Sequence, residues 1–145
     1  MLRVRGLVVI AMALLCVGCL APRSADMASV DGRCWESAAE IKVENVDTLS
    51  LRNIAVAIRY NSNFGEVTLP LNIKVVAPDG RTFNEPFTLH LEGVKRATTI
   101  SQSVAIPYRK SALLAMKGTY TFFLEPSLSV KGVEAIGVEI TEIKD

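Results

Sequence analysis

The chain has 145 residues, of which 50% are hydrophobic and 21% are charged. That length suits one folded domain, and that composition is unlike the composition of a disordered chain. A formal net charge of +1 provides no general attraction for nucleic acid. The chain has a single histidine, which argues against a metal site built from histidines and against a histidine-based catalytic dyad. We therefore expect one globular domain that binds neither nucleic acid nor a metal ion.

Residues 1–18 have the character of a secretory signal. Arg3 and Arg5 precede a continuous apolar run, which is short for a membrane span of about 20 residues. Gly18 and Cys19 stand where a small-residue cleavage site is usually found. This arrangement resembles a bacterial lipobox, which implies that Cys19 receives a diacylglycerol and an N-acyl chain and becomes the new N-terminus.

The lipobox interpretation also accounts for the three cysteines. Cys16 is removed with the signal, Cys19 carries the lipid, and Cys34 is left without an intramolecular partner. We therefore expect a domain that is stable through its core rather than through a disulfide. The acyl chains would make the attachment durable, because each buried methylene adds about 0.8 kcal/mol. We expect no cofactor other than this covalent lipid.

The mature chain is expected to consist of a tether and a domain. Residues 19–33 are mostly small and polar, which predicts a lipidated tether that lifts the domain off the bilayer. In residues 34–145 apolar and polar side chains alternate at a period of two, which is typical of half-buried β-strands. The alternation is seen over residues 41–43, 54–60, 67–76, 83–91, 100–106, 120–125 and 136–140.

Turn signals separate these runs, among them Pro78-Asp79-Gly80 and Lys117-Gly118. Residues 110–116 (KSALLAM) favour one short helix of at most two turns. About seven short strands at a spacing of roughly ten residues predict an all-β fold. We expect an antiparallel β-sandwich of the immunoglobulin-like or jelly-roll-like kind.

Trp35 and four longer stretches follow one another in a characteristic order. The stretches are residues 51–61 (LRNIAVAIRYN), 69–80 (LPLNIKVVAPDG), 118–124 (GTYTFFL) and 132–140 (GVEAIGVEI). In this order, behind a lipoprotein signal, they resemble the GldH family of gliding-motility lipoproteins from Bacteroidetes. The resemblance covers about residues 30–143. Residues 92–102 (EGVKRATTISQ) depart from it, because family members often carry a Trp- and Gly-rich stretch there.

The resemblance implies a non-enzymatic accessory lipoprotein of the gliding-motility and type IX secretion apparatus. Such a protein would sit in the outer membrane through the lipid on Cys19 and would contact other envelope proteins by strand addition or by a side-chain patch. The chain has no acidic cluster directly after Cys19, which favours the periplasmic side. The alternative is a carbohydrate- or ligand-binding β-sandwich lipoprotein. A lipid-anchored hydrolase is a third possibility, against which the absence of catalytic motifs argues.

Few side chains suggest chemistry, and we predict no catalytic or metal-ligating residue. His90 should lie on the solvated face, because the leucines on both sides of it take the buried positions. Glu139 and Glu142 are interpreted as solvating charges rather than an acid–base pair. The basic pairs at 95–96 and 109–110 are interpreted as loop charge or as a rim contact for an acidic partner.

Cys34 and Trp35 stand at the start of the expected domain and admit two interpretations. The pair packs into the core, with Trp35 as an aromatic anchor, or Cys34 is a thiol that pairs with a partner and Trp35 is an exposed partner contact. Asp47-Thr48-Leu49 resembles the O-glycosylation signal that Bacteroidetes use for exported proteins. Thr48 is therefore a candidate acceptor.

Overall fold

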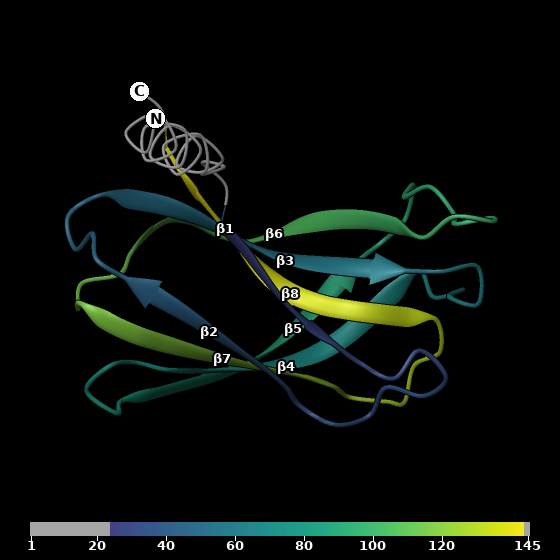
Figure 1. The fold of residues 1–145 in the computed structure, drawn as a ribbon, viewed down its shortest axis with the longest axis horizontal. Helices are drawn as coiled ribbons and strands as arrows, with labels where there is room; N and C mark the ends of the chain where they lie inside the picture. The colour runs from purple at the N-terminus through teal and green to yellow at the C-terminus, as the bar shows by residue number, and fades with distance from the viewer. Residues whose placement is uncertain (1–23, 144–145) are drawn as a thin grey trace, which may run out of the picture.

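The computed structural model describes residues 24–143 and shows an all-β domain (Figure 1). Within these residues there is no helix, and hence none with the length and hydrophobicity to cross a membrane. The strands are β1 (Ser24–Ser29), β2 (Ala39–Asn45), β3 (Leu51–Tyr60), β4 (Thr68–Val76), β5 (Thr82–His90), β6 (Gln102–Leu113), β7 (Gly118–Pro126) and β8 (Val133–Glu142). The predicted fold class is thus confirmed.

The strands form two antiparallel sheets that pack face to face as a sandwich (Figure 1). The first sheet has the order β1-β8-β3-β6, and the second sheet has the order β2-β7-β4-β5. β1 and β2 lie close together along one side of the sandwich. β5 and β6 are the edge strands at the other side, so each of them has a main-chain partner on one flank only.

Alternation of apolar and polar residues explains which side chains form the core. In β2 every second side chain is buried, from Ala39 to Asn45. The inward positions of β3 and β8 hold large branched or aromatic side chains, and those of β4 and β7 meet them from the opposite sheet. Burying one such side chain contributes about 1.5–3 kcal/mol. Ile58, Ile73, Leu89, Leu124, Val133 and Ile136 are completely buried.

The prediction of a short helix at residues 110–116 is wrong. β6 continues to Leu113, which pairs with Leu51, and the chain then bends. The side-chain amide of Asn45 donates to the carbonyl oxygens of Leu114 at 2.9 Å and of Met116 at 2.8 Å. These carbonyls are therefore held away from helical hydrogen bonds. The apolar spacing that suggested a helix comes from a strand end followed by the buried side chain of Leu114.

Part of the stretch expected to be a tether is a strand instead. β1 pairs antiparallel with β8, and Met27 lies opposite Gly137. A Cβ atom at Gly137 would lie 2.2 Å from the main-chain oxygen of Asp26, so only glycine permits this close approach. The sequence of residues 24–29 (SADMAS) contains only one large apolar residue, Met27, and hence gave no strand signal. The folded part therefore begins ahead of Cys34.

Candidate functional site

Trp35 belongs to the core and anchors the segment that leads into β2. Its side chain is 2% exposed, its indole N–H donates to the carbonyl oxygen of Ser37 at 2.7 Å, and its main chain bridges to Val130. The anchor interpretation is confirmed, and the alternative of an exposed partner contact is wrong. Cys34, one residue earlier, is an exposed free thiol that lies 3.8 Å from a carboxylate oxygen of Glu36.

The other predicted candidates do not come together into one site. His90 is exposed at the end of β5, as predicted. Thr48 lies in the β2–β3 turn, where hydrogen bonds from Ser50 and then Leu49 lower the pKa of Asp47 to about 2. Glycosylation of Thr48 remains a prediction. Lipidation of Cys19 also remains a prediction, because this residue lies outside the described residues. Within those residues no group of three or more His, Cys, Asp or Glu is placed to hold a metal ion.

The outer faces of the two sheets differ in character. The second sheet presents charged and polar side chains, among them Glu40, Lys42, Glu44 and Lys74. On the first sheet the outward positions at the centre carry small side chains, and the strand register places Ala57 of β3 beside Ala105 of β6. We call this surface the small-residue face; it consists of Ala55, Ala57, Ala105, Pro107 and Ala135.

A hollow of about 230 Å³ opens in the small-residue face, and we call it the face hollow. A β-bulge produces it, because the pairing of β3 with β6 shifts register on both sides of Ile54. At the bulge Ser111 has a positive φ of 54° and donates its N–H to the side-chain oxygen of Asn53 at 3.2 Å. Ala55, Ala105 and Pro107 line it with small apolar groups, and the polar groups around it belong to Asn53, Arg109, Lys110, Glu139 and Thr141.

Side chains close the edge of the sandwich beside the face hollow. A carboxylate oxygen of Glu85 on β5 accepts hydrogen bonds from the hydroxyl of Tyr108 and the guanidinium of Arg109, both on β6. The rings of Tyr108 and Phe87 meet edge to face with their centroids 4.9 Å apart. Burial, followed by the hydrogen bond to Glu85, raises the pKa of Tyr108 well above its usual value of 10. The two edge strands are therefore joined by side chains.

Each of these edge strands carries a proline in its interior, Pro86 in β5 and Pro107 in β6. A proline has no main-chain N–H to donate, and native proteins use it to block pairing at sheet edges. Strand addition at β5 or β6 is therefore disfavoured. Of the two binding modes expected from the sequence, a side-chain patch agrees better with this edge.

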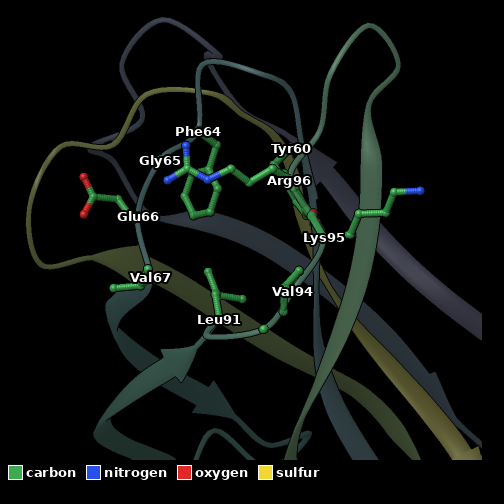
Figure 2. A pocket seen from close by; sticks show the side chains of 10 residues that line it. Tyr60, Phe64, Gly65, Glu66, Val67, Leu91, Val94, Lys95 and Arg96 are labelled. Carbon is green, nitrogen blue, oxygen red and sulfur yellow. The ribbon is translucent and has the colours of Figure 1, made fainter.

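A second hollow, of about 180 Å³, lies at one end of the sandwich between the β3–β4 and β5–β6 loops (Figure 2). We call it the end hollow. Its lining combines the apolar side chains of Phe64, Val67, Leu91 and Val94 with the basic pair at 95–96. The sequence analysis interpreted this pair as loop charge or as a rim contact for an acidic partner, and the structure places both residues in the lining of the end hollow.

Sequence reasoning missed both hollows. The face hollow depends on a bulge and on outward-facing alanines. The alternation pattern predicted that these alanines face away from the core, but it gave no sign of a hollow between them. The end hollow depends on two loops that are distant in the sequence and adjacent in space (Figure 2). The only sequence signal for the end hollow was the basic pair at 95–96, which follows the end of a buried strand. This pair borders a hollow only because the β3–β4 loop lies opposite.

No protein-family model matches the chain, and no curated protein matches it. Among solved structures, it is similar to xylanase 10C from Cellvibrio japonicus in complex with xylopentaose, with 12% identity, a TM-score of 0.37, and coverage of 86% of this chain and 25% of that one. It is similar to a structure of carbohydrate-binding modules from the β-sandwich superfamily, with 11% identity, a TM-score of 0.39, and coverage of 86% of this chain and 55% of that one. A family 16 carbohydrate-binding module shares 10% identity at a TM-score of 0.29, over 85% of this chain and 86% of that one. The chain thus covers a quarter of the xylanase and about half of the carbohydrate-binding-module structure. The similarity is in the fold alone.

Proposed function

We propose that the chain is a lipid-anchored, non-enzymatic binding module of the bacterial cell envelope. The lipid on Cys19 holds the domain at the outer membrane, and the small-residue face contacts a folded envelope protein. Its role is that of an accessory component of gliding motility and the associated type IX secretion machinery. The observation that carries the proposal is the face hollow within a surface of small side chains.

Small outward side chains suit protein contact because they let a partner approach the sheet closely. The face hollow is large enough to receive a partner side chain, and apolar groups line its centre. Arg109, Lys110 and Glu139 supply charges of both signs around it. An apolar centre with a polar rim is the usual anatomy of a protein–protein interface. The outer face of the second sheet is arranged differently: the charged side chains of β2 lie along one edge, and near the centre Lys74 lies over the ring of Phe123.

Carbohydrate binding is the second candidate, and one observation favours it. Asn53, Glu139 and Thr141 offer hydrogen-bonding groups beside the apolar lining of the face hollow, an arrangement that suits a polar ligand. A sugar platform usually also needs an aromatic ring. Among the described residues the large exposed aromatic side chain is Phe83, on β5 of the other sheet. The small-residue face therefore suits a protein better than a sugar.

Complementation of a deletion strain tests the proposal. The variants are Cys19→Ala, which removes the anchor, and Ala105→Arg, which fills the face hollow. Thr88→Arg places the same side chain at an exposed outward position of the second sheet and serves as the matched control. We expect the wild type and Thr88→Arg to restore colony spreading and cargo secretion, and the other two to fail. Normal spreading and secretion in the uncomplemented deletion strain would contradict the proposed role.

A further inference from the structure

The end hollow has the size and position of a small-ligand site separate from the small-residue face. It lies where the β3–β4 loop passes the β5–β6 loop (Figure 2), and Tyr60 and Phe64 line it with ring centroids 5.4 Å apart. Its volume of about 180 Å³ is below the range of about 300–1,000 Å³ that is typical for drug-sized ligands. A ligand smaller than a drug-sized molecule therefore suits it best.

Hydrogen bonds hold the walls of the end hollow in place without a ligand. The hydroxyl of Tyr60 donates to the carbonyl oxygen of Lys95, and the N–H of Leu91 donates to the carbonyl oxygen of Val67 at 2.8 Å. These two bonds join the loops to the strand ends on both sides. A preformed site of this kind loses less free energy to ordering when it binds.

The far end of the β5–β6 loop is fixed as well. The hydroxyl of Ser101 lies 2.8 Å from both carboxylate oxygens of Glu134, and Arg59 lies 3.3 Å from the same carboxylate. Behind Phe64, Gly132 adopts a positive φ of 85°, and a Cβ atom there would lie 2.2 Å from the main-chain nitrogen of Phe64. The β7–β8 connection therefore packs directly against the main chain of Phe64.

The charged groups at the mouth favour an anion. In Figure 2 the Arg96 side chain extends across the mouth toward Phe64 and Gly65, whereas Lys95 and Glu66 point away from the hollow. Among the described residues, neither Lys95 nor Arg96 forms an ion pair. A guanidinium without a carboxylate partner binds a carboxylate by charge-assisted hydrogen bonds.

We propose that the end hollow binds a small amphipathic carboxylate. The apolar chain of the ligand lies against Phe64, Leu91 and Val94, and its carboxylate pairs with the guanidinium of Arg96 at the mouth. This combination of an apolar interior and one convergent polar group is characteristic of ligand pockets. The inference does not rest on the proposed role of the small-residue face, so that either one can fail while the other stands.

Titration of the purified protein with hexanoate, followed by two-dimensional ¹H–¹⁵N NMR, tests this proposal. Hexanol has the same chain without the charge, and hexylamine has a positive charge. We expect hexanoate to shift the amide signals of residues 64–67 and 91–96 and to bind at least fivefold more tightly than hexanol, with hexylamine weaker still. Equal binding of hexanoate and hexanol, or hexanoate shifts confined to other regions, would overturn the proposal.

Two charge variants separate the carboxylate contact from the shape of the hollow. Arg96→Gln keeps a long polar side chain, and we expect it to weaken hexanoate about fivefold to tenfold and to leave hexanol unchanged. Val67 is 56% exposed at the mouth, so Val67→Glu and Val67→Gln both leave the core intact. Val67→Glu should abolish hexanoate binding by repulsion, and Val67→Gln should retain most of it.

Lys117→Gln is the matched control, because Lys117 is an exposed basic residue in the β6–β7 connection at the opposite end of the sandwich. It should bind hexanoate as the wild type does. A thermal melt of each variant confirms that the fold is retained. Equal affinity of Arg96→Gln and Lys117→Gln for hexanoate would show that the carboxylate does not bind at the mouth of the end hollow. Equal affinity of Val67→Glu and Val67→Gln for hexanoate would show the same.

Discussion

Tyr108 on β6 donates a hydrogen bond to Glu85 on β5, and these two residues belong to the edge strands of opposite sheets. β5 and β6 therefore rely on side chains to stay together on the open side of the sandwich. Arg109 donates to the same carboxylate and also lines the face hollow. The shape of the proposed binding face is thus coupled to this contact between the sheets.

Removing the hydroxyl of Tyr108 should weaken the contact without removing the ring. We expect Tyr108→Phe to lower the free energy of unfolding by about 1 kcal/mol, because the bond has a charged acceptor and is only half-buried. Urea denaturation measures this loss. In the background Glu85→Gln the same substitution should cost clearly less. Equal costs in the two backgrounds would show that the hydroxyl and the carboxylate do not interact.

Asn45 should be the most sensitive polar residue in the described part of the chain. Its side chain is 1% exposed, and its amide satisfies two carbonyl oxygens of the β6–β7 connection. Asn45→Ala leaves both without a donor, and we expect a loss of about 3 kcal/mol in unfolding free energy. Asn84→Ala, at an exposed position of β5, should change it by about 0.5 kcal/mol or less. Similar midpoints for the two variants in chemical denaturation would contradict this account.

Gly137 should control whether β1 joins the first sheet. A side chain at this position would overlap the main chain of Asp26, so Gly137→Val should displace β1 and leave the other strands paired. Hydrogen exchange should then show loss of protection in Ser24–Ser29 and at the β8 amides that face β1, with the other strands still protected. Gly65→Ala is the control, because a Cβ there meets nothing within 4 Å. Full protection of β1 in Gly137→Val would rule out the close approach.

The stability of the domain should fall in acid through Glu134 and Asp47. Hydrogen bonding by Ser101, followed by Asn61 and the charge of Arg59, lowers the pKa of Glu134 below its usual 4.5. A carboxylate with a lowered pKa in the folded state stabilises it above the unfolded-state pKa and loses this effect as pH falls through the folded-state pKa. For Asp47 the loss continues to about pH 2.

Thermal melts between about pH 6 and pH 2 measure this dependence. Glu134→Gln should show a smaller drop of the melting midpoint between pH 5 and pH 3 than the wild type, because the titrating group is gone. Glu142→Gln is a control, since this exposed carboxylate at the end of β8 has no ion pair among the described residues. An unchanged pH profile in Glu134→Gln would show that its contacts do not stabilise the ionised form.

Long-range packing explains what could be predicted from the sequence and what could not. Alternation of apolar and polar residues identified strands such as residues 54–60 and 67–76, because neighbouring residues of a half-buried strand face the core and the solvent in turn. β1 escaped detection because its sequence holds only one large apolar residue, Met27, and its place depends on Gly137 of a strand more than a hundred positions away. The stretch at residues 110–116 was misinterpreted because Asn45, also distant in the sequence, determines how its carbonyls are satisfied.

The candidate sites show the same division. The basic pair at 95–96 was interpreted from the sequence as loop charge or as a rim contact for an acidic partner, because the hollow that it borders exists only where the β3–β4 loop lies opposite. The face hollow requires the bulge at Ile54, which has no local sequence signature. Trp35 offered two interpretations because an aromatic residue at a domain start suits either the core or a contact, and its burial decided between them.

Cysteine labelling in the cell envelope tests the central claim most directly. In a Cys34→Ser background, Ala105→Cys and Thr88→Cys each place one thiol on the outer face of one sheet, and a maleimide reports its access. We predict that residue 105 is protected in intact envelopes and reacts readily in the purified protein, whereas residue 88 reacts in both. Equal reactivity of residue 105 in envelopes and in the purified protein would contradict the proposal that the small-residue face is bound by a partner.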